Sequence, residues 1–332
     1  MDIETLYAIE NYEVLKSLLR ARYVLGVHHN IAVSVSGGSD SDIVLDLVQK
    51  AKENKEVQYI WFDTGIEYDA TKRHLVKLEN KYSIKIQRIK AQKPIPLCVR
   101  DFGLPFVSKY ASSMIERLQK HGFKWEDKPI EVLLKDYPRC QQAVKWWCNA
   151  NESDMFNIGN NRFLKEFLIA NPPQFKISAR CCDYAKKNVS KHFIKENHID
   201  LMVVGIRRAE GGVRAGAYQS CFTDSNGLTA DQYRPIFFYD EADKTYYERM
   251  FDIVHSDCYT KYGFKRTGCV GCPFALDLDN ELEQTARFEP KLYNLCTRIF
   301  GVSYEYTRAY RRFRDNRKEF EQSGGQLNLF DD

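Results

Sequence analysis

The sequence lacks the features that mark membrane, secreted and strongly charged proteins. No apolar run in its 332 residues approaches the length of a membrane span, and the N-terminal residues are acidic and mixed rather than those of a secretory signal. We therefore expect a cytoplasmic protein with no membrane partner. A net charge of +4 is too small to indicate nucleic-acid or membrane binding by the surface as a whole.

Two chemical signatures are also missing. The Walker A pattern G-x-x-x-x-G-K-[ST] does not occur, which excludes an ordinary P-loop nucleotidase. The last of the ten cysteines is Cys296, so the C-terminal segment carries no thiol. In a reducing compartment these cysteines are not expected to form a disulfide framework, and some of them are expected to bind a metal.

The hydrophobic pattern alternates between strand-like and helix-like segments. The expected elements are a helix over 2–26, strands at 31–36, 58–62, 83–89 and 201–206, helices at 41–53 and 69–81, and an edge segment at Pro235–Tyr239. This alternation predicts an α/β protein with a doubly wound parallel sheet. Its ligand is then expected beyond the carboxyl ends of the strands.

The same pattern predicts how the chain is divided. We expect an N-terminal helix at 1–25, a nucleotide-binding domain at 26–240 with a helical insertion at about 94–175, a helical C-terminal region at 241–322, and a flexible tail at 323–332. Seven prolines interrupt the strand–helix rhythm of the insertion, which we interpret as a lid over the nucleotide.

A Ser/Gly segment joins the first strand to the following helix. It consists of Ser36, Gly37, Gly38, Ser39, Asp40 and Ser41. Unpaired amides at the start of a helix, together with the helix dipole, favour a phosphate, and glycines allow the backbone to approach it closely. The alternative is a Gly/Ser turn that binds nothing.

Two further strand ends suit a nucleotide. Asp63 and Thr64 follow the second strand, where they can reach a magnesium ion or the nucleotide. Arg207 and Arg214 follow the fourth strand, and Glu210 lies between them. Arginine has a planar set of donors that fits phosphate or sulfate, and a neighbouring carboxylate can hold it in place.

The segments SGGSDS, FDTGIEY and GIRRAEGGVR, in this order, resemble the phosphoadenosine phosphosulfate reductase family. The resemblance covers about residues 25–275 and implies the adenine nucleotide α-hydrolase fold, with ATP or an adenylyl sulfate and Mg²⁺ as ligands. It implies catalytic roles for Asp40, Asp63, Arg207 and Glu210. It implies nucleotide binding by Ser36, Gly37, Gly38, Ser39, Asp40, Ser41, Asp63, Thr64, Gly65, Gly205, Arg207 and Arg214.

The chain departs from this family at two places. Ser39 stands where many members have lysine. The missing cation would weaken pyrophosphate binding, or arginines would neutralise the pyrophosphate instead. The thiol that reductases of the family carry near the C-terminus is absent, which makes reduction by that route doubtful. Relatives that cleave ATP at the α-phosphate and insert sulfur need no such thiol.

The cysteine spacing carries a second signal. Cys269 and Cys272 form a C-x-x-C around a Gly, and Cys181 and Cys182 precede them in tandem. Within the family, this set resembles the ligands of a [4Fe–4S] cluster, which requires four thiolates. Zinc binding and no metal at all remain alternatives. Cys258 and Cys221 are the candidates to replace one of the tandem pair, and core positions are expected for Cys98, Cys140, Cys148 and Cys296.

The C-terminal residues suggest a partner. Gln326–Phe330 resembles the short peptide by which bacterial DNA-processing proteins dock on the sliding clamp, and the alternative is an apolar segment packed on the body. A basic run upstream suits either a solvated helix face or DNA phosphates, and its members are Arg308, Arg311, Arg312, Arg314, Arg317 and Lys318.

Two functions follow from these observations. The first is an iron–sulfur enzyme that cleaves a nucleotide at its α-phosphate or sulfate and transfers sulfur, with a sulfur donor protein and a nucleic acid as expected partners. The second is a regulatory protein that binds nucleotide and cluster without turnover, alongside a DNA-binding partner. Asp40, Asp63 and Arg207 favour the enzyme, whereas Ser39 and the missing C-terminal thiol favour the regulator.

Overall fold

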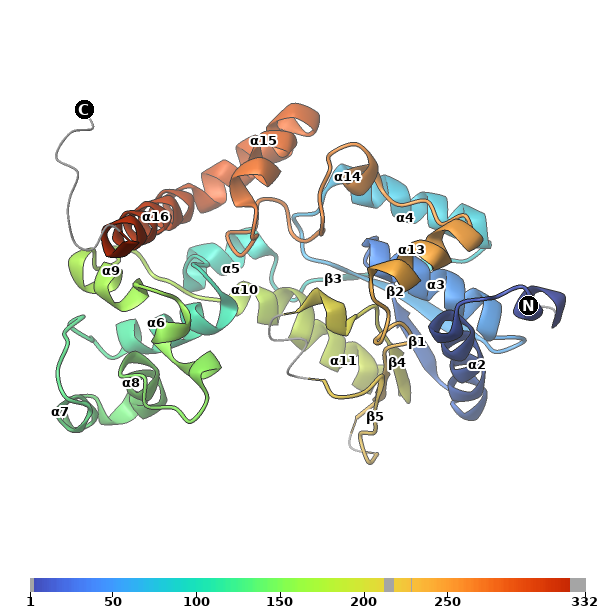
Figure 1. The fold of residues 1–332 in the computed structure, drawn as a ribbon, viewed down its shortest axis with the longest axis horizontal. Coiled ribbons are helices and arrows are strands. Elements are labelled where there is room, and N and C mark those ends of the chain that lie inside the picture. The colour runs from blue at the N-terminus through green and yellow to red at the C-terminus, as the bar shows by residue number, and fades with distance from the viewer. Residues whose placement is uncertain (1–2, 212–217, 228, 323–332) are drawn as a thin grey trace. The chain divides into compact units, whose positions relative to one another are not determined.

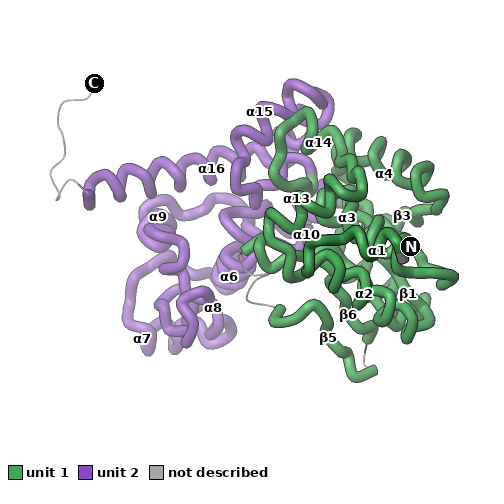
Figure 2. Tube along the Cα trace, turned by 45° about the vertical axis from the view of Figure 1, so that its right-hand side comes forward, with its two compact units in different colours: residues 1–94, 184–269 green, residues 95–183, 270–332 purple. Residues whose placement is uncertain are grey.

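The computed structural model describes residues 3–211, 218–227 and 229–322 (Figure 1). The chain forms two compact units, which Figure 2 shows in different colours. The first, called the sheet unit here, comprises residues 1–94 and 184–269. The second, called the helical unit, comprises residues 95–183 and 270–332. The domain boundaries expected from the sequence stay a prediction.

The sheet unit is built on six strands in the order β3-β2-β1-β4-β6-β5. Their bounds are β1 Ile31–Ser34, β2 Val57–Asp63, β3 Ile86–Lys90, β4 Leu201–Val203, β5 Phe222–Thr223 and β6 Asp231–Tyr233. All neighbouring pairs are parallel except the short edge pair of β5 and β6. The predicted α/β fold with a parallel-dominated sheet is therefore confirmed.

Side chains of β1 alternate between two cores, one on each face of the sheet. Ile31 and Val33 belong to the larger core, which buries apolar residues of the helices α2 (Tyr12–Val27), α3 (Ser39–Ala51) and α4 (Asp69–Tyr82). Ala32 lies on the other face, in a core that includes Phe193 of α11. Helices on both faces leave the carboxyl ends of the strands as the open edge, and β1 and β4 meet where the strand order changes direction.

The helices of the sheet unit are α1 Ile3–Tyr7, α2 Tyr12–Val27, α3 Ser39–Ala51, α4 Asp69–Tyr82, α11 Asn188–Glu196, η5 Arg208–Glu210, α13 Glu241–Met250 and α14 Asp257–Thr260. The expected single helix over 2–26 is two helices, because the Asn11 side chain caps a new start by accepting from the Val14 amide at 2.9 Å. The expected edge segment Pro235–Tyr239 is a turn, and the strand precedes it as β6.

The helical unit contains α5 Ile95–Phe102, α6 Lys109–Lys120, α7 Ile130–Asp136, η1 Pro138–Cys140, α8 Gln141–Trp147, η2 Asp154–Phe156, η3 Ile158–Asn160, α9 Leu164–Ala170, α10 Arg180–Cys182, α15 Leu278–Phe288 and α16 Pro290–Gln322, with the π-helical η4 Asp183–Lys187 at its boundary. Its own core buries Phe106, Trp146, Trp147, Phe167 and Tyr310. None of the described helices combines the length and the apolar character that a bilayer crossing requires.

Candidate nucleotide-binding site

The loop between β1 and α3 is held in shape by its own side chains. Gly37 has φ +71°, and a Cβ there would lie 2.9 Å from Thr71 Cγ2, so only glycine fits. The Ser36 amide donates to Ser41 Oγ at 2.8 Å, and the Gly38 amide donates to Ser36 Oγ at 3.4 Å. The hydroxyls that the sequence suggested as phosphate donors therefore also fix the loop.

The amides at the start of α3 are available to an anion. The first helical hydrogen bond runs from the Asp42 amide to the Gly38 carbonyl, at 3.0 Å. Within the described residues, the amides of Asp40 and Ser41 have no acceptor. They lie at the positive end of the helix dipole, so this helix end favours a negatively charged group such as a phosphate.

The end of β4 approaches the same helix very closely. A Cβ on Gly205 would lie 3.0 Å from the carbonyl carbon and oxygen of Asp40 and from the Ser41 amide nitrogen. Any larger residue would push β4 away from α3. Gly205, expected from the family resemblance to contact nucleotide, thus has a packing role that also brings Arg207 to the loop.

Asp40 is the centre of a buried charge network. Arg207 Nε lies 3.0 Å from both Asp40 carboxylate oxygens, and Arg207 Nη1 donates to Glu241 Oε1 at 2.9 Å. Lys244 Nζ lies 3.1 Å from Asp40 Oδ1 and donates to Ser39 Oγ at 2.6 Å. Burial opposes ionisation of Asp40, but Lys244 and Arg207 outweigh it and hold its pKa below the usual value.

Lys244 brings a cation to the place where the sequence suggested that one was lost. Its ammonium group reaches Ser39 from α13, and its side chain is only 14% exposed. Sequence reasoning missed this residue because it lies 205 positions from Ser39 and carries no local motif. The only signal was the departure at Ser39 itself.

Tyr259 and Thr267 also lie at the loop, and the sequence singled out neither. The Tyr259 hydroxyl lies 3.1 Å from Thr267 Oγ1. A Cβ on Gly38 would lie 3.3 Å from this hydroxyl and 3.4 Å from Thr267 Oγ1. Hydroxyl groups from the chain beyond α13 therefore lie against the loop at Gly38.

The second predicted loop is closed by internal contacts. Asp63 Oδ2 accepts from Arg88 Nε at 2.6 Å, and Asp63 Oδ1 accepts from the Gly65 amide at 2.8 Å. Thr64 Oγ1 donates to Glu67 Oε1 at 2.7 Å, and burial raises the pKa of the Glu67 carboxyl. Asp63 and Thr64 thus hold the turn after β2 in a defined shape.

These contacts bear on the expected magnesium ion. Asp40 and Asp63 each already accept from cationic side chains, and so neither offers an unshared carboxylate. The part of the chain that the structure describes contains no group of three or more His, Cys, Asp or Glu side chains that could hold a metal ion. The carboxylates do not fit a dedicated magnesium site.

The third predicted segment is only partly assembled around Arg207. Glu210 lies 3.5 Å from Arg266 Nη2, whereas the carboxylates that pair with Arg207 are Asp40 and Glu241. Arg214 lies outside the described residues. The catalytic and binding roles expected for these residues stay predictions.

The cysteines expected to bind a cluster belong to both units. Cys269 is the last residue of the sheet unit, whereas Cys181, Cys182 and Cys272 belong to the helical unit. None of the ten cysteines is in a disulfide. In the C-x-x-C turn, Gly271 has φ +59°, and its carbonyl accepts from the Tyr304 hydroxyl of α16. The turn between the two cysteines therefore depends on glycine, and cluster binding stays a prediction.

The other cysteines are mostly core residues. Cys258 is fully buried, with its sulfur 3.7 Å from Thr71 Oγ1, and Cys221 lies in the larger core of the sheet unit. Cys181 of the tandem pair is buried as well, so burial does not distinguish these cysteines, and the alternative ligands stay a prediction. The expected burial holds for Cys98, Cys140 and Cys296, whereas Cys148 is partly exposed.

Beneath the loop lies a relay of charged groups that sequence analysis did not identify. Asp42 Oδ2, in the first turn of α3, lies 2.9 Å from His74 Nε2 and 2.8 Å from His255 Nδ1. His255 Nε2 lies 2.9 Å from Glu248 Oε1. Burial disfavours the charged imidazole, but hydrogen bonds to Asp42 and Glu248 outweigh it and raise the pKa of His255 to about 9.

Comparison with known proteins identifies part of the chain. Residues 30–122 match the phosphoadenosine phosphosulfate reductase domain. This match confirms the resemblance that the motifs indicated, and it covers the first two of them. Two uncharacterised proteins of Methanocaldococcus jannaschii are each 24% identical to the chain, over 79% and 84% of its length. The alignments cover 40% and 50% of those relatives, so the chain spans half of their length or less.

Solved structures also resemble the chain. Phosphoadenylyl-sulfate reductase of Candida auris has a TM-score of 0.42 at 12% identity, over 81% of this chain and 96% of that one. The U34-tRNA thiolase NcsA of Methanococcus maripaludis, solved with its [4Fe–4S] cluster, has a TM-score of 0.39 at 16% identity, over 91% and 80%. Neither similarity assigns an activity to this chain.

The His255 relay predicts a pH-dependent stability. The folded pKa of about 9 lies above the ordinary value of 6.5, so the stabilisation is complete below pH 6.5 and is lost as the pH rises through 9. The free energy of unfolding in urea should therefore differ most between wild type and His255→Gln near pH 6, and this difference should shrink by pH 9.5. His192→Gln, at an exposed position of α11, is the control. A difference that stays constant from pH 6 to 9.5 contradicts the assignment.

Proposed function

We propose that this protein, whose residues 30–122 match the phosphoadenosine phosphosulfate reductase domain, binds ATP or an adenylyl sulfate at Ser36–Ser41 and acts at its α-phosphate or sulfate to activate or transfer sulfur. One observation carries the proposal. Two buried cations, Arg207 and Lys244, meet at the helix end whose amides are available to an anion. That combination suits a nucleotide polyphosphate.

The proposed reaction has two steps. ATP first adenylylates an acceptor oxygen: the oxygen bonds to the α-phosphorus, and the bond to pyrophosphate breaks. A sulfide supplied by a donor protein then attacks the acceptor carbon, the carbon–oxygen bond breaks, and AMP leaves. The α3 amides and Lys244 would neutralise charge on the phosphates, and Arg207 would hold Asp40 and the loop in position.

A [4Fe–4S] cluster held by Cys181, Cys182, Cys269 and Cys272 is the second part of the proposal, and when bound it would supply electron transfer. The sheet unit itself supports a link between this site and the loop. Thr267 lies at the loop, and Cys269 follows two residues later, so at most about 7 Å of extended chain separates them.

A regulatory role without turnover is the second candidate. The observation that favours it is the engagement of both predicted acidic residues, Asp40 by Arg207 and Lys244 and Asp63 by Arg88. Neither carboxylate is then open to activate an acceptor. Release of pyrophosphate from ATP, with and without candidate RNA or DNA acceptors, distinguishes the two functions, because only the enzyme produces it.

The nucleotide site predicts which substitutions weaken binding. Lys244→Gln and Arg207→Ala should each weaken ATP or adenylyl sulfate binding by roughly ten- to hundredfold, because one charge-assisted contact contributes about 1.5–3 kcal/mol. Asp40→Ala should also weaken binding, since both cations lose the carboxylate that positions them. Calorimetric titration measures the affinities.

Lys77→Gln is the matched control, because it removes one positive charge from an exposed position of α4. Circular dichroism spectra that match those of wild type would show that the variants are folded. If folded Lys244→Gln and Arg207→Ala both bind ATP as tightly as Lys77→Gln does, the site assignment is wrong.

The cluster predicts a metal content. Anaerobically purified protein should contain about four irons and four sulfides per chain, and Cys269→Ser should lose them, because four thiolates are needed. Cys148→Ser, at a partly exposed cysteine outside the proposed set, should keep the cluster. Stoichiometric zinc in colourless protein would show that these cysteines bind zinc instead of a cluster. If Cys258→Ser loses the cluster and Cys181→Ser keeps it, Cys258 is a ligand in place of Cys181.

The proposed nucleic-acid link includes the C-terminal peptide Gln326–Phe330, which lies outside the described residues and rests on its sequence alone. Leu329→Ala combined with Phe330→Ala should abolish binding to a purified bacterial sliding clamp, because these are the apolar anchors. Wild type should bind at micromolar affinity, as expected for a short peptide. Equal calorimetric titrations of both proteins, or no binding by either at tens of micromolar, would rule out the clamp.

A further inference from the structure

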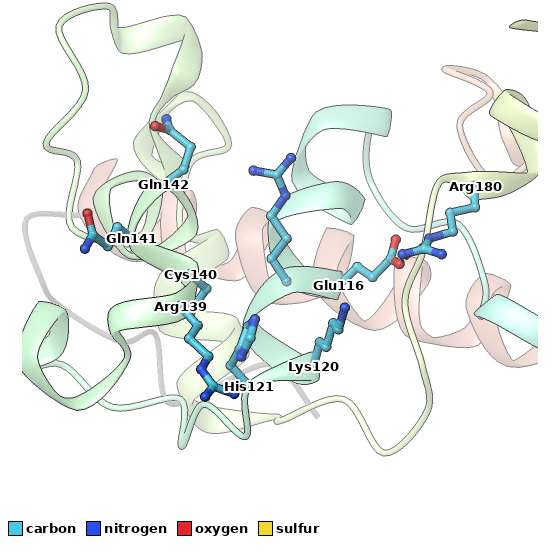
Figure 3. Close-up of a pocket in the computed structure, with 9 residues that line it drawn as sticks. Glu116, Lys120, His121, Arg139, Cys140, Gln141, Gln142 and Arg180 are labelled. Carbon is cyan, nitrogen blue, oxygen red and sulfur yellow. Dashed lines mark ion pairs between the residues drawn. The ribbon is translucent and has the colours of Figure 1, made fainter. Parts of the chain in front are cut away.

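A second polar pocket lies in the helical unit. It has a volume of about 340 Å³, and Figure 3 shows the residues that line it. α6 and the turn after it contribute Glu116, Arg117, Lys120 and His121, and η1 contributes Arg139. Arg180 from α10 and two glutamines, Gln141 and Gln142 of α8, complete the polar lining. The lining carries four formal positive charges and one negative, whereas the whole chain has a net charge of only +4.

The amphipathic pattern of α6 holds these cations on one side. Its apolar residues Ala111, Ile115 and Leu118 are buried in the core of the helical unit. Arg117 and Lys120 are three residues apart and so share the opposite face. The core therefore fixes the helix in an orientation that leaves these cations beside the pocket.

Most of the basic side chains that line the pocket are not paired with a carboxylate of the described residues. Arg117, Lys120, His121 and Arg139 form no ion pair with any carboxylate in the described residues 3–211, 218–227 and 229–322. Figure 3 shows His121 and Arg139 among the side chains that line the pocket. A bound anion would give these basic side chains the ion pairs that the described residues do not supply.

The one carboxylate of the lining is already engaged. Glu116 Oε1 lies 2.6 Å from Arg180 Nε, and Glu116 Oε2 accepts from Ser178 Oγ at 2.8 Å. The Arg180 guanidinium also lies over the Phe102 ring, 5.2 Å from its centre. Glu116 thus holds Arg180 at the wall of the pocket and does not neutralise Arg117, Lys120 or Arg139.

We propose that this pocket binds the phosphate of a phosphate ester, supplied by a mononucleotide or by a nucleic-acid chain. Arginine guanidinium groups match two phosphate oxygens at once, lysine adds a compact charge, and histidine donates one further hydrogen bond. The volume accommodates a phosphate with its attached sugar. The proposal is independent of the nucleotide chemistry proposed for the sheet unit.

The test compares two variants that each remove two positive charges from the full-length protein. Lys120→Gln combined with Arg139→Gln removes charges from the pocket. Lys135→Gln combined with Lys145→Gln removes charges from exposed positions of the same unit outside the pocket. All four side chains are exposed, and these positions have no described ion pair, so both variants should fold. Circular dichroism and thermal unfolding verify that they do.

Binding is measured with two probes, ribose 5-phosphate by calorimetry and a fluorescein-labelled single-stranded oligonucleotide by anisotropy. The pocket variant should bind at least one probe more than about tenfold more weakly than the control variant does. Weaker binding of the oligonucleotide alone identifies a nucleic-acid chain as the source of the phosphate. The slope of log affinity against log salt should then fall by about 0.7, because one phosphate contact on a single strand is lost.

Weaker binding of both probes by a similar factor identifies a small phosphate ester as the ligand. Equal affinities of the pocket and control variants for both probes overturn the proposal. Because the readout is binding that depends on Lys120 and Arg139, the result does not depend on turnover or on the Ser36–Ser41 loop.

Discussion

The geometry of the sheet unit's site depends on one buried carboxylate. Asp40 lies in the first turn of α3 and is shared by Arg207, which follows β4, and Lys244 from α13. A buried ion pair is costly unless its geometry is good, and here the hydrogen bonds to Arg207 and Lys244 satisfy the carboxylate. Three segments that are distant in sequence are thereby fixed around one loop.

This dependence explains why Gly205 and Ser39 are small. Gly205 allows β4 to pass 3.0 Å from the backbone of Asp40 and Ser41, which brings Arg207 within reach of Asp40. Ser39 leaves room for Lys244 and accepts a hydrogen bond from it. A lysine at position 39 would compete with Lys244 for the same space and the same carboxylate. The cation beside this loop is therefore supplied by α13.

Much of the sheet unit could be predicted from local pattern. Strand-like segments such as 31–36 and turn chemistry at Ser36–Ser41 are encoded within a few residues, and the structure has β1 and the start of α3 there. Element ends were less predictable, because the cap at Asn11 and the turn at Pro235–Tyr239 depend on single side chains and on packing.

The contacts that complete the candidate site were not predictable in this way. The fold brings distant segments together at this site, and they contribute Lys244, Tyr259 and Arg88. No periodicity or spacing in the sequence predicts such contacts. The same limit applies to Asp63, which the sequence presented as an open acidic residue and the structure pairs with Arg88. Residue type indicated the chemistry, and tertiary contacts decided which groups are available.

The length of α16 separates two parts of the helical unit. Tyr304 fixes the C-x-x-C turn through Gly271, and the helix continues for 18 more residues to Gln322. A helix rises about 1.5 Å per residue, so the chain leaves α16 about 27 Å from that turn. The side chains of the last described turn of α16 are therefore too far from Gly271 to contact it, and a substitution near Gln322 leaves the packing of Tyr304 on that turn unchanged.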